Sequence, residues 1–381
     1  MNQLVNLKIE DVLPRDGYAG TLVGRVWLPD VGGPAIAVIR ESGVYDISEN
    51  TPTMSSLLEL QDPARAVLDM SGHRIGSLSE LLPNLLAPCD LQVVKASGVT
   101  FAASLLERVI EERAAGDRRK AENIRASVEQ AIGGDLRAIK PGSPAAKELK
   151  AMLIRQGMWS QYLEVGIGPD AEVFTKVPVL ASVGTGAEIG IHPGSEWNNP
   201  EPEIVLAVNS RGDIVGAALG NDVNLRDVEG RSALLLGKAK DNNASCAIGP
   251  FIRLFDSTFT LDEVRQEDVE LLVEGDDGFV LHGTSTMREI SRDPTELVAQ
   301  TIGANHQYPD GFMLFLGTMF APVQDRGTAG RGFTHAVGDR VTIRSVHLGS
   351  LVNRVNTSDR VQPWTFGLRA LFCNLAARGL L

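Results

Sequence analysis

The stretch that decides the fold is Asn198–Asp227, which reads NNPEPEIVLAVNSRGDIVGAALGNDVNLRD. It contains two apolar runs, Ile204–Val208 and Ile214–Leu219, and between them lies a segment rich in Asn, Ser, Gly and Asp. Apolar runs of this length indicate strands, and the residues between them are typical of a turn. The sequence therefore predicts an antiparallel hairpin that turns about Ser210–Gly212.

Three carboxylates are expected to meet at the open end of this hairpin. Glu201 and Glu203 flank Pro202, and residues two apart on an extended chain project from the same face. If the strands pair about Ser210–Gly212, Asp222 returns to lie beside Glu201. Such carboxylates cannot all stay ionised without a counter-charge. Oxygen ligands without a nearby His or Cys favour Mg²⁺, with Mn²⁺ or Ca²⁺ as substitutes. The alternative is a solvated polar rim that holds no ion.

The composition of the chain is that of a soluble globular protein. It has 381 residues, of which 43% are hydrophobic and 22% charged, so it can bury a sizeable core. A net charge of −12 argues against a nucleic-acid partner or an anionic membrane surface. Three scattered cysteines indicate reduced thiols, and neither a signal peptide nor an apolar run of roughly 20 residues is present. We expect a cytoplasmic protein.

The chain is expected to divide near residue 90. Residues 1–90 are interpreted as a small β-rich domain with strands at Leu22–Leu28 and Ala35–Ile39, and residues 91–381 as the catalytic domain. His73, in a Ser-Gly-His-Arg segment, is interpreted as a surface loop histidine. Later segments predict further elements, which are strands at Val269–Val273 and Phe312–Phe320, a last hairpin of Val341–Val346 and Leu348–Val352, and helices at Asp293–Gly303 and Trp364–Leu380.

A helical lid or arm is expected over residues 102–160. Apolar residues recur at helical spacing from Ser104 onward, and Ser143 before a proline is a typical helix start. A Gly-Gly break is expected at 133–134. On local pattern alone, the charges of the first helix are interpreted as a solvent-facing surface with ion pairs such as that between Arg108 and Glu112.

Several motifs in order along the chain carry a family resemblance. They are Glu201-Pro-Glu203, Asn221-Asp222-Val-Asn-Leu-Arg226-Asp227, Ala239-Lys240, Cys246-Ala-Ile-Gly249-Pro250 and Gly317-Thr318. Together they resemble the fumarylacetoacetate hydrolase superfamily over about residues 90 to 360. Segments around Gly98–Phe101, Glu107–Arg113 and Trp197–Pro200 look most like its sugar-acid dehydratase branch. The fold that this resemblance implies is α+β and β-rich, a mixed β-roll or sandwich with peripheral helices.

The resemblance also implies a set of site residues. It makes Glu201, Glu203 and Asp222 the metal ligands, in agreement with the hairpin argument. The implied catalytic residues are Lys240, Glu111 and Glu107, and the implied substrate-binding residues are Ser104, Thr100, Arg226 and Thr318. The sequence pattern alone favours an ordinary surface lysine at Lys240. Ser104 stands where hydrolase members carry a water-activating histidine, which puts hydrolysis in doubt and fits a dehydratase.

The function implied by the resemblance is Mg²⁺-dependent dehydration of a 2-keto-3-deoxy sugar acid. The substrate would be 2-keto-3-deoxy-D-xylonate or D-arabinonate, and the product 2-ketoglutarate semialdehyde, in non-phosphorylative pentose catabolism. Lys240 would remove the C3 proton, and Glu111 or Glu107 would protonate the leaving hydroxyl. A hydrolase or decarboxylase of β-diketo acids on the same metal site is one alternative, and a non-catalytic metabolite-binding protein with a structural cation is another. A homo-oligomer is expected from the family habit and the helical arm.

Overall fold

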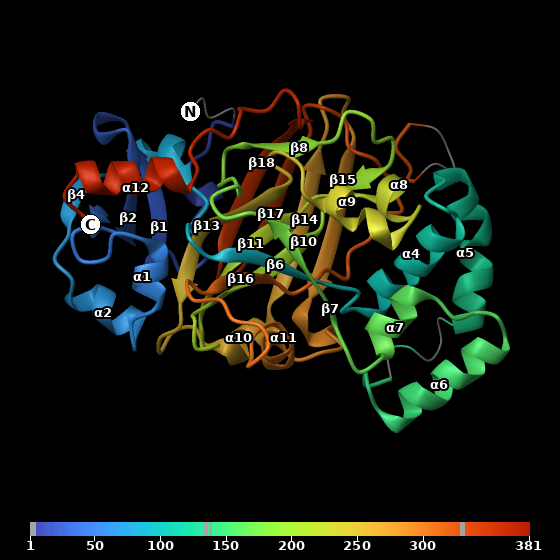
Figure 1. The fold of residues 1–381 in the computed structure, drawn as a ribbon. Coiled ribbons are helices and arrows are strands. Elements are labelled where there is room, and N and C mark those ends of the chain that lie inside the picture. Colours follow the sequence, from blue (N-terminus) through green and yellow to red (C-terminus); the bar gives the residue numbers. More distant parts are fainter. Residues whose placement is uncertain (1–4, 133–135, 137–138, 328–331) are drawn as a thin grey trace.

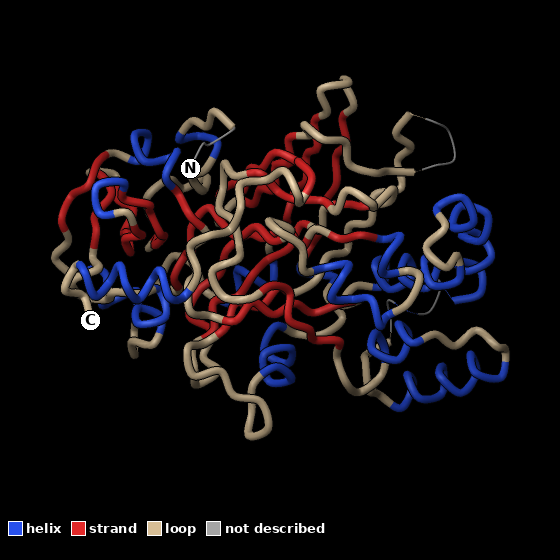
Figure 2. The backbone as a smooth tube through the Cα atoms, turned by 45° about the horizontal axis from the view of Figure 1, so that its top comes forward, coloured by secondary structure: helices blue, strands red, loops and turns tan. Residues whose placement is uncertain are grey.

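Two β-sheets occupy the middle of the protein, and its helices gather mainly at the two ends. The computed structural model describes residues 5–132, 136, 139–327 and 332–381. Figure 1 shows the sheets between an N-terminal part and a helical arm, and Figure 2 shows the same separation of strands from helices. The Gly-Gly break expected at 133–134 lies outside the described residues.

The large sheet has eleven strands, and the predicted hairpin lies near its centre. In spatial order its strands are β4 (His73–Gly76), β3 (Gly43–Asp46), β2 (Gly33–Arg40), β1 (Leu22–Leu28), β13 (Cys246–Leu254), β11 (Ile214–Asp222), β10 (Pro202–Val208), β16 (Phe312–Phe315), β6 (Val93–Gly98) and β7 (Glu172–Val177), with β5 (Leu85–Leu86) beside β1. Its pairs are antiparallel except β6 with β16, which is parallel. Because β1 pairs with β13, the sheet continues across residue 90. The division into two domains there stays a prediction.

A second sheet packs on one face of the hairpin. Its strands, in spatial order, are β15 (Val280–Thr286), β14 (Asp268–Glu274), β17 (Arg340–Ser345), β18 (Gly349–Thr357) and β8 (Glu188–Ile191). Alternate residues of β10 point to opposite faces, as the period of a strand requires. Leu206 packs into a core with Leu271 and Ile343 of the second sheet, whereas Val205 packs into another core with Met54 and Leu57. The hairpin is therefore buried on both faces and rigidly held.

The helices cover the sheets and build the arm. They are α1 (Met54–Leu58), α2 (Pro63–Asp69), α3 (Leu78–Leu81), α4 (Ala102–Arg113), α5 (Arg118–Ile132), α6 (Pro144–Arg155), α7 (Gln161–Ile167), α8 (Arg226–Glu229), α9 (Leu236–Lys240), α10 (Leu261–Gln266), α11 (Pro294–Thr301) and α12 (Leu368–Ala377). Helices α4–α7 share a core of their own that includes Val109, Leu153 and Leu163. Helix α6 starts as predicted, because the Ser143 side chain accepts a hydrogen bond from the backbone N–H of Ala146.

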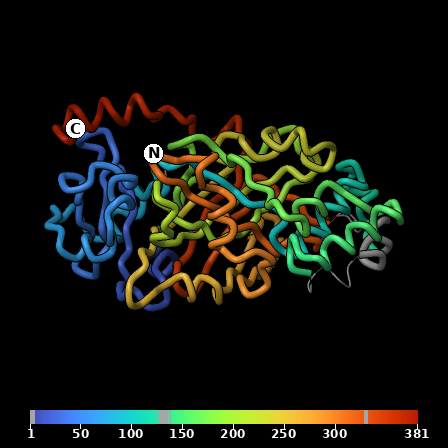
Figure 3. Tube along the Cα trace, turned by 60° about the horizontal axis from the view of Figure 1, so that its bottom comes forward, coloured from blue at the N-terminus to red at the C-terminus, as the bar shows by residue number. Residues whose placement is uncertain are grey.

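The C-terminal helix lies against the N-terminal part of the chain. Figure 3 shows α12 running beside the first strands, and Arg378 donates a hydrogen bond to the backbone oxygen of Pro34 at 2.6 Å. In this view segments from the two ends of the chain lie side by side. None of the helices within the described ranges combines the length and the hydropathy that a bilayer-spanning helix needs.

The sequence predicted the fold class and most elements correctly, with corrections at their limits. The strand predicted over Phe312–Phe320 ends at Phe315, where the chain turns into the site. The helix predicted over Trp364–Leu380 spans only Leu368–Ala377. His73 is exposed as expected, but it begins strand β4 and does not lie in a loop.

Candidate functional site

The hairpin of β10 and β11 has the register that the sequence predicted. Pro202 lies opposite Asn221, and the backbone N–H of Asp222 donates to the backbone oxygen of Glu201 at 3.0 Å. The turn closes because the Asn209 side-chain oxygen accepts from the backbone N–H of Asp213 at 2.9 Å, which holds the loop in shape. The turn chemistry therefore brings Asp222 back to the two glutamates.

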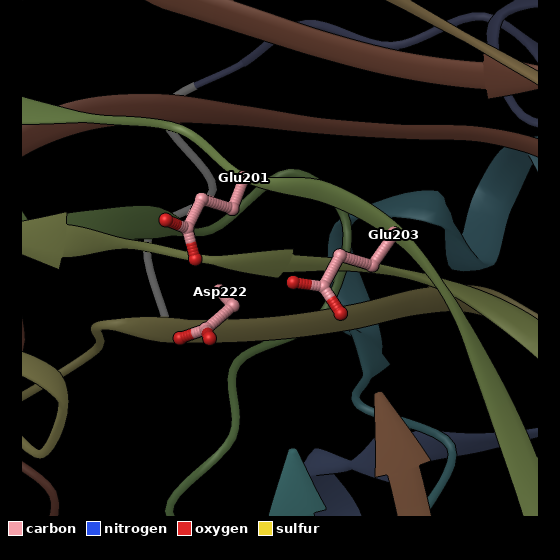
Figure 4. A group of neighbouring side chains, drawn as sticks. All are labelled: Glu201, Glu203 and Asp222. Carbon is pink, nitrogen blue, oxygen red and sulfur yellow. The ribbon is translucent and has the colours of Figure 1, made fainter. Parts of the chain in front are cut away.

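Three carboxylates converge at this end of the hairpin. Glu201, Glu203 and Asp222 are all buried, and one oxygen of each lies within 4.8 Å of the others. Figure 4 shows their carboxylate groups pointing toward one another. The solvated-rim alternative is wrong, since a rim would leave these side chains in water.

Two lysines lie against this cluster. Lys240 donates to Glu201 at 2.6 Å and to Asp222 at 2.8 Å. Lys176 lies 2.9 Å from the other oxygen of Asp222 and is fully buried. Burial acts to lower the pKa of Lys240, but the charges of Asp222 and Glu201 outweigh it and raise the pKa above its ordinary value. Lys240 is thus no surface lysine, and its ammonium group belongs to the acidic cluster.

Glu203 has a different environment from its two neighbours. Its carboxylate accepts a hydrogen bond from the backbone N–H of Gly317 at 2.6 Å. Burial and the nearby charges of Asp222 and Glu201 raise the pKa of Glu203 well above its usual range. Gly317 has φ +88, and a Cβ there would lie 2.1 Å from the Thr100 hydroxyl oxygen, so only glycine fits this approach.

The two glutamates predicted on the arm bind the predicted arginine. Arg226 donates to Glu111 at 2.6 Å and to Glu107 at 2.7 Å, and its guanidinium lies 4.3 Å from the ring centroid of Trp197. Glu107 also pairs with Arg125. Burial acts to raise the pKa of Glu111, but the charges of Arg108 and Arg226 outweigh it and lower the pKa. These residues tie α4 to the start of α8.

The solvent-facing interpretation of the first arm helix is wrong at three positions. Arg108 points into the cavity and pairs with Glu111 and Glu201. Glu107 is 8% exposed and Glu111 only 1%, because α8 packs over this face of α4. The suggested pair of Arg108 with Glu112 is replaced by these buried contacts.

Of the three other residues predicted to bind substrate, two line the cavity and the third, Thr100, lies behind its wall. Thr318 and Ser104 both line the cavity, and the Ser104 hydroxyl donates to the backbone oxygen of Phe101 at 3.0 Å. The Thr100 hydroxyl is buried and donates to the backbone oxygen of Leu316 at 2.6 Å, so it supports the strand end that carries Gly317. Direct substrate binding by these three residues stays a prediction.

Sequence reasoning missed four polar residues of the cavity and its acidic cluster. Lys176 carried no clear signal, because strand β7 also contains the polar residues Glu172 and Thr175. Burial is the main cause that raises the pKa of Glu172, and burial raises the pKa of Glu229 to about 7. The Asn199 side-chain oxygen is buried in the cavity wall without a hydrogen-bond partner, and Asn199 is two residues before Glu201 along the chain.

The donor set fits a hard divalent cation. Oxygens about 2.0–2.1 Å from one Mg²⁺ lie at most about 4.2 Å apart, so the observed spacing needs only small side-chain adjustments. The described cluster of ligand-type groups contains carboxylates alone, without His or Cys. Hard cations prefer such oxygens. Glu201, Glu203 and Asp222 are therefore suited to hold Mg²⁺, Mn²⁺ or Ca²⁺.

Solved structures share this fold over most of their length. A 2-keto-3-deoxy-D-arabinonate dehydratase complexed with magnesium and 2,5-dioxopentanoate superposes with a TM-score of 0.59 and 21% identity, covering 88% of this chain and 99% of that one. The fumarylacetoacetate hydrolase of Exiguobacterium antarcticum superposes with a TM-score of 0.54 and 16% identity, again covering 88% and 99%. The chain has the fumarylacetoacetate hydrolase fold. The fold that the sequence motifs implied is confirmed.

Sequence comparison adds a curated relative. A protein of Haloferax volcanii described as a probable 2-keto-3-deoxyxylonate dehydratase is 30% identical over 200 residues, which cover 52% of this chain and 65% of that protein. The chain therefore matches less than two thirds of this curated relative's length. No family model matches the chain.

Proposed function

We propose that this chain is a divalent-metal-dependent hydro-lyase that removes water from a 2-keto-3-deoxy sugar acid. The observation that carries the proposal is the buried cluster of Glu201, Glu203 and Asp222 with the Lys240 ammonium against it. Supporting it, one fold neighbour is a dehydratase complexed with magnesium and 2,5-dioxopentanoate. We propose Mg²⁺ as the ion and 2-keto-3-deoxy-D-xylonate or D-arabinonate as the substrate.

The proposed chemistry divides between the ion and the protein. A bound Mg²⁺ supplies a Lewis acid that draws electron density from the 2-keto group and makes the C3 protons more acidic. Lys240 is the lysine among the described residues that line the cavity, and in its neutral form it would take one C3 proton. A divalent cation on Glu201 and Asp222 would offset the carboxylate charges that now hold Lys240 protonated and so favour that neutral form. As the C3–H electrons form the new C=C bond, the C4 hydroxyl leaves with a proton as water. The product of this elimination is 5-hydroxy-2-oxopent-3-enoate. Transfer of a proton from C5 to C3 converts it to the C5 enol, which tautomerises to 2-ketoglutarate semialdehyde.

The proton for the leaving hydroxyl needs a carboxyl group that is protonated near neutral pH. Glu111 and Glu107 were predicted for this role, but both are ion-paired with arginines, and the pKa of Glu111 is lowered. Glu172 and Glu229 line the same cavity and burial raises the pKa of both, but Glu229 is ion-paired with Arg108. We therefore place Glu172 ahead of Glu111 and Glu107 as the general acid.

The other polar residues position the reactants in this proposal. Arg226 holds Glu107 and Glu111 and so fixes the arm over the cavity. Thr318 follows Gly317 at the end of β16 and offers a hydroxyl to the substrate carboxylate. The arm and the sheet then exclude bulk water from the reacting carbons, which suits an elimination.

A coupled assay tests the reaction. Purified protein with Mg²⁺ and 2-keto-3-deoxypentonate is expected to form semialdehyde, detected by an NAD-dependent aldehyde dehydrogenase, and EDTA is expected to abolish the signal. Lys240→Met is expected to abolish turnover, with binding of Mn²⁺ by the variant measured separately. Unaltered turnover in that variant would remove Lys240 from the mechanism.

Two further substrate sets separate the alternatives. Cleavage or decarboxylation of acylpyruvates without semialdehyde formation would favour a hydrolase or decarboxylase. Stabilisation by 2-keto acids and Mg²⁺ without turnover of any substrate would favour a non-catalytic metabolite-binding protein. Ser104 carries no imidazole to activate water, and its hydroxyl already donates to the backbone, which favours the elimination.

The predicted homo-oligomer is part of the proposal. Three apolar side chains near the C-terminus, Trp364, Leu368 and Phe372, are exposed by 41–46%. Apolar groups gathered at a surface often mark a subunit contact. Sedimentation equilibrium of the full chain, with and without Phe372→Ser, tests this point, and a wild type that sediments as a monomer would reject it.

A further inference from the structure

Arg108 reaches from the arm into the candidate metal centre. One nitrogen of its guanidinium donates to Glu201 at 2.5 Å, and another donates to Glu111 at 2.7 Å. The second nitrogen also lies 3.2 Å from Glu229. Its side chain is 13% exposed and lines the cavity. An arginine that the sequence placed in solvent is therefore bonded to one of the three candidate metal ligands.

Arg108 is the cation of this cluster that can most easily give up its place. Lys240 bridges two of the candidate ligands, Glu201 and Asp222, and so is anchored between them. Arg108 contacts only Glu201 among the ligands and has Glu111 and Glu229 as further partners. If it releases Glu201, it still keeps two carboxylates. A divalent cation on Glu201 would repel the adjacent guanidinium and favour this release.

The size of the cavity also points to movement of this side chain. The cavity bounded by the acids, Arg108 and Lys240 measures about 30 Å³. That is room for an ion or a water, whereas small-molecule sites usually measure about 300–1,000 Å³. A five-carbon acid therefore needs space that side chains now fill. Arg108 stands over the ligands and belongs to the arm, so its displacement opens space beside the ion.

We propose that Arg108 competes with the divalent cation for Glu201 and, once the cation binds, turns its freed nitrogen to the carboxylate of the 2-oxo acid. Arg108 then acts as a positioning and specificity residue that couples the two binding events. Guanidinium groups match carboxylates through paired, charge-assisted hydrogen bonds. The inference rests on the proposed metal site, but not on the elimination itself.

The first measurement is metal affinity without substrate. Mn²⁺ binding to the apoprotein, followed by calorimetry, is expected to tighten at least fivefold in Arg108→Met. Arg113→Met is the matched control, because Arg113 is an exposed arginine of the same helix and its removal changes the net charge equally. Its Mn²⁺ affinity is expected to stay within twofold of wild type. Arg108→Met affinity equal to or weaker than wild type would overturn the proposal.

The second measurement uses pyruvate as the probe on Mn²⁺-saturated protein. Pyruvate affinity is expected to fall at least fivefold in Arg108→Met and to stay unchanged in Arg113→Met, and an unchanged affinity in Arg108→Met would also overturn the proposal. Arg108→Gln, whose amide can still donate to Glu111 and Glu229, gives the same test if the Met variant does not fold. A wild type that binds no Mn²⁺ would instead reject the proposed function.

Discussion

The prediction that most sharply tests the architecture of the site concerns Lys176. Lys176→Met removes a fully buried ammonium that lies 2.9 Å from Asp222 and donates to the backbone oxygen of Val223 at 3.1 Å and to that of Lys240. Removing one partner of a buried ion pair costs about 3–5 kcal/mol, because the other charge stays buried. Methionine fills a similar volume, so the cavity that it leaves is small. We expect the free energy of unfolding to fall by about 3–5 kcal/mol.

Lys95→Met is the matched control for this prediction. Lys95 is half-buried on the neighbouring strand β6 and donates to the Thr175 hydroxyl at 3.0 Å. A hydrogen bond of this kind contributes about 0.5–1.5 kcal/mol. Urea denaturation in EDTA is followed by both tryptophan fluorescence and far-UV circular dichroism. If the unfolding transitions seen by the two probes coincide, they give the change in free energy of unfolding for each variant. Equal losses in the two lysine variants, or a Lys176→Met loss below about 1 kcal/mol, would refute the reasoning.

Three further predictions use the same urea assay. An added methyl in Gly220→Ala would lie 2.3 Å from a ring carbon of Phe315, so we expect a loss of about 1–3 kcal/mol, and an unchanged midpoint would contradict this packing. Burial acts to raise the pKa of Asp339, but hydrogen bonds from His335 and Arg326 outweigh it and lower the pKa. The pKa of Asp339 in the folded protein is therefore below its unfolded value of about 3.9. Asp339→Asn is expected to lower the free energy of unfolding by about 3 kcal/mol near pH 7, and this loss should shrink as the pH falls below about 4. A difference in free energy of unfolding between wild type and Asp339→Asn that grows at acid pH would contradict this prediction. Mg²⁺ at about 100 times its Kd should raise the free energy of unfolding by about 2.7 kcal/mol, and EDTA should reverse this gain.

The metal ligands could be predicted because their information is local. Glu201 and Glu203 are two residues apart on one strand, and a short turn sequence fixes how Asp222 returns. Two apolar runs, turn chemistry and carboxylate spacing all act within thirty residues of one another, and each is visible in the sequence. The hairpin and its cluster therefore followed from strand geometry alone.

The burial of the arm charges could not be predicted in this way. Glu107 and Glu111 have the spacing of an exposed helix face, and their arginine partner, Arg226, is more than a hundred residues away. The burial of Arg108 has the same kind of cause, because its partner Glu201 is also far away in the sequence, at the hairpin. A local pattern cannot report a partner that only the packing of α4 against α8 supplies.

The pairing of β1 with β13 has a consequence for anyone who wishes to shorten this protein. Deleting the first ninety residues would remove a hydrogen-bonded neighbour from Arg253 and Ile252. Strand β13, whose side chains are mostly apolar, would then have unpaired backbone N–H and C=O groups along this edge. Exposed strand edges of this kind pair with other copies of a protein and lead to aggregation. A shortened chain must therefore keep β1 or carry a replacement strand beside β13.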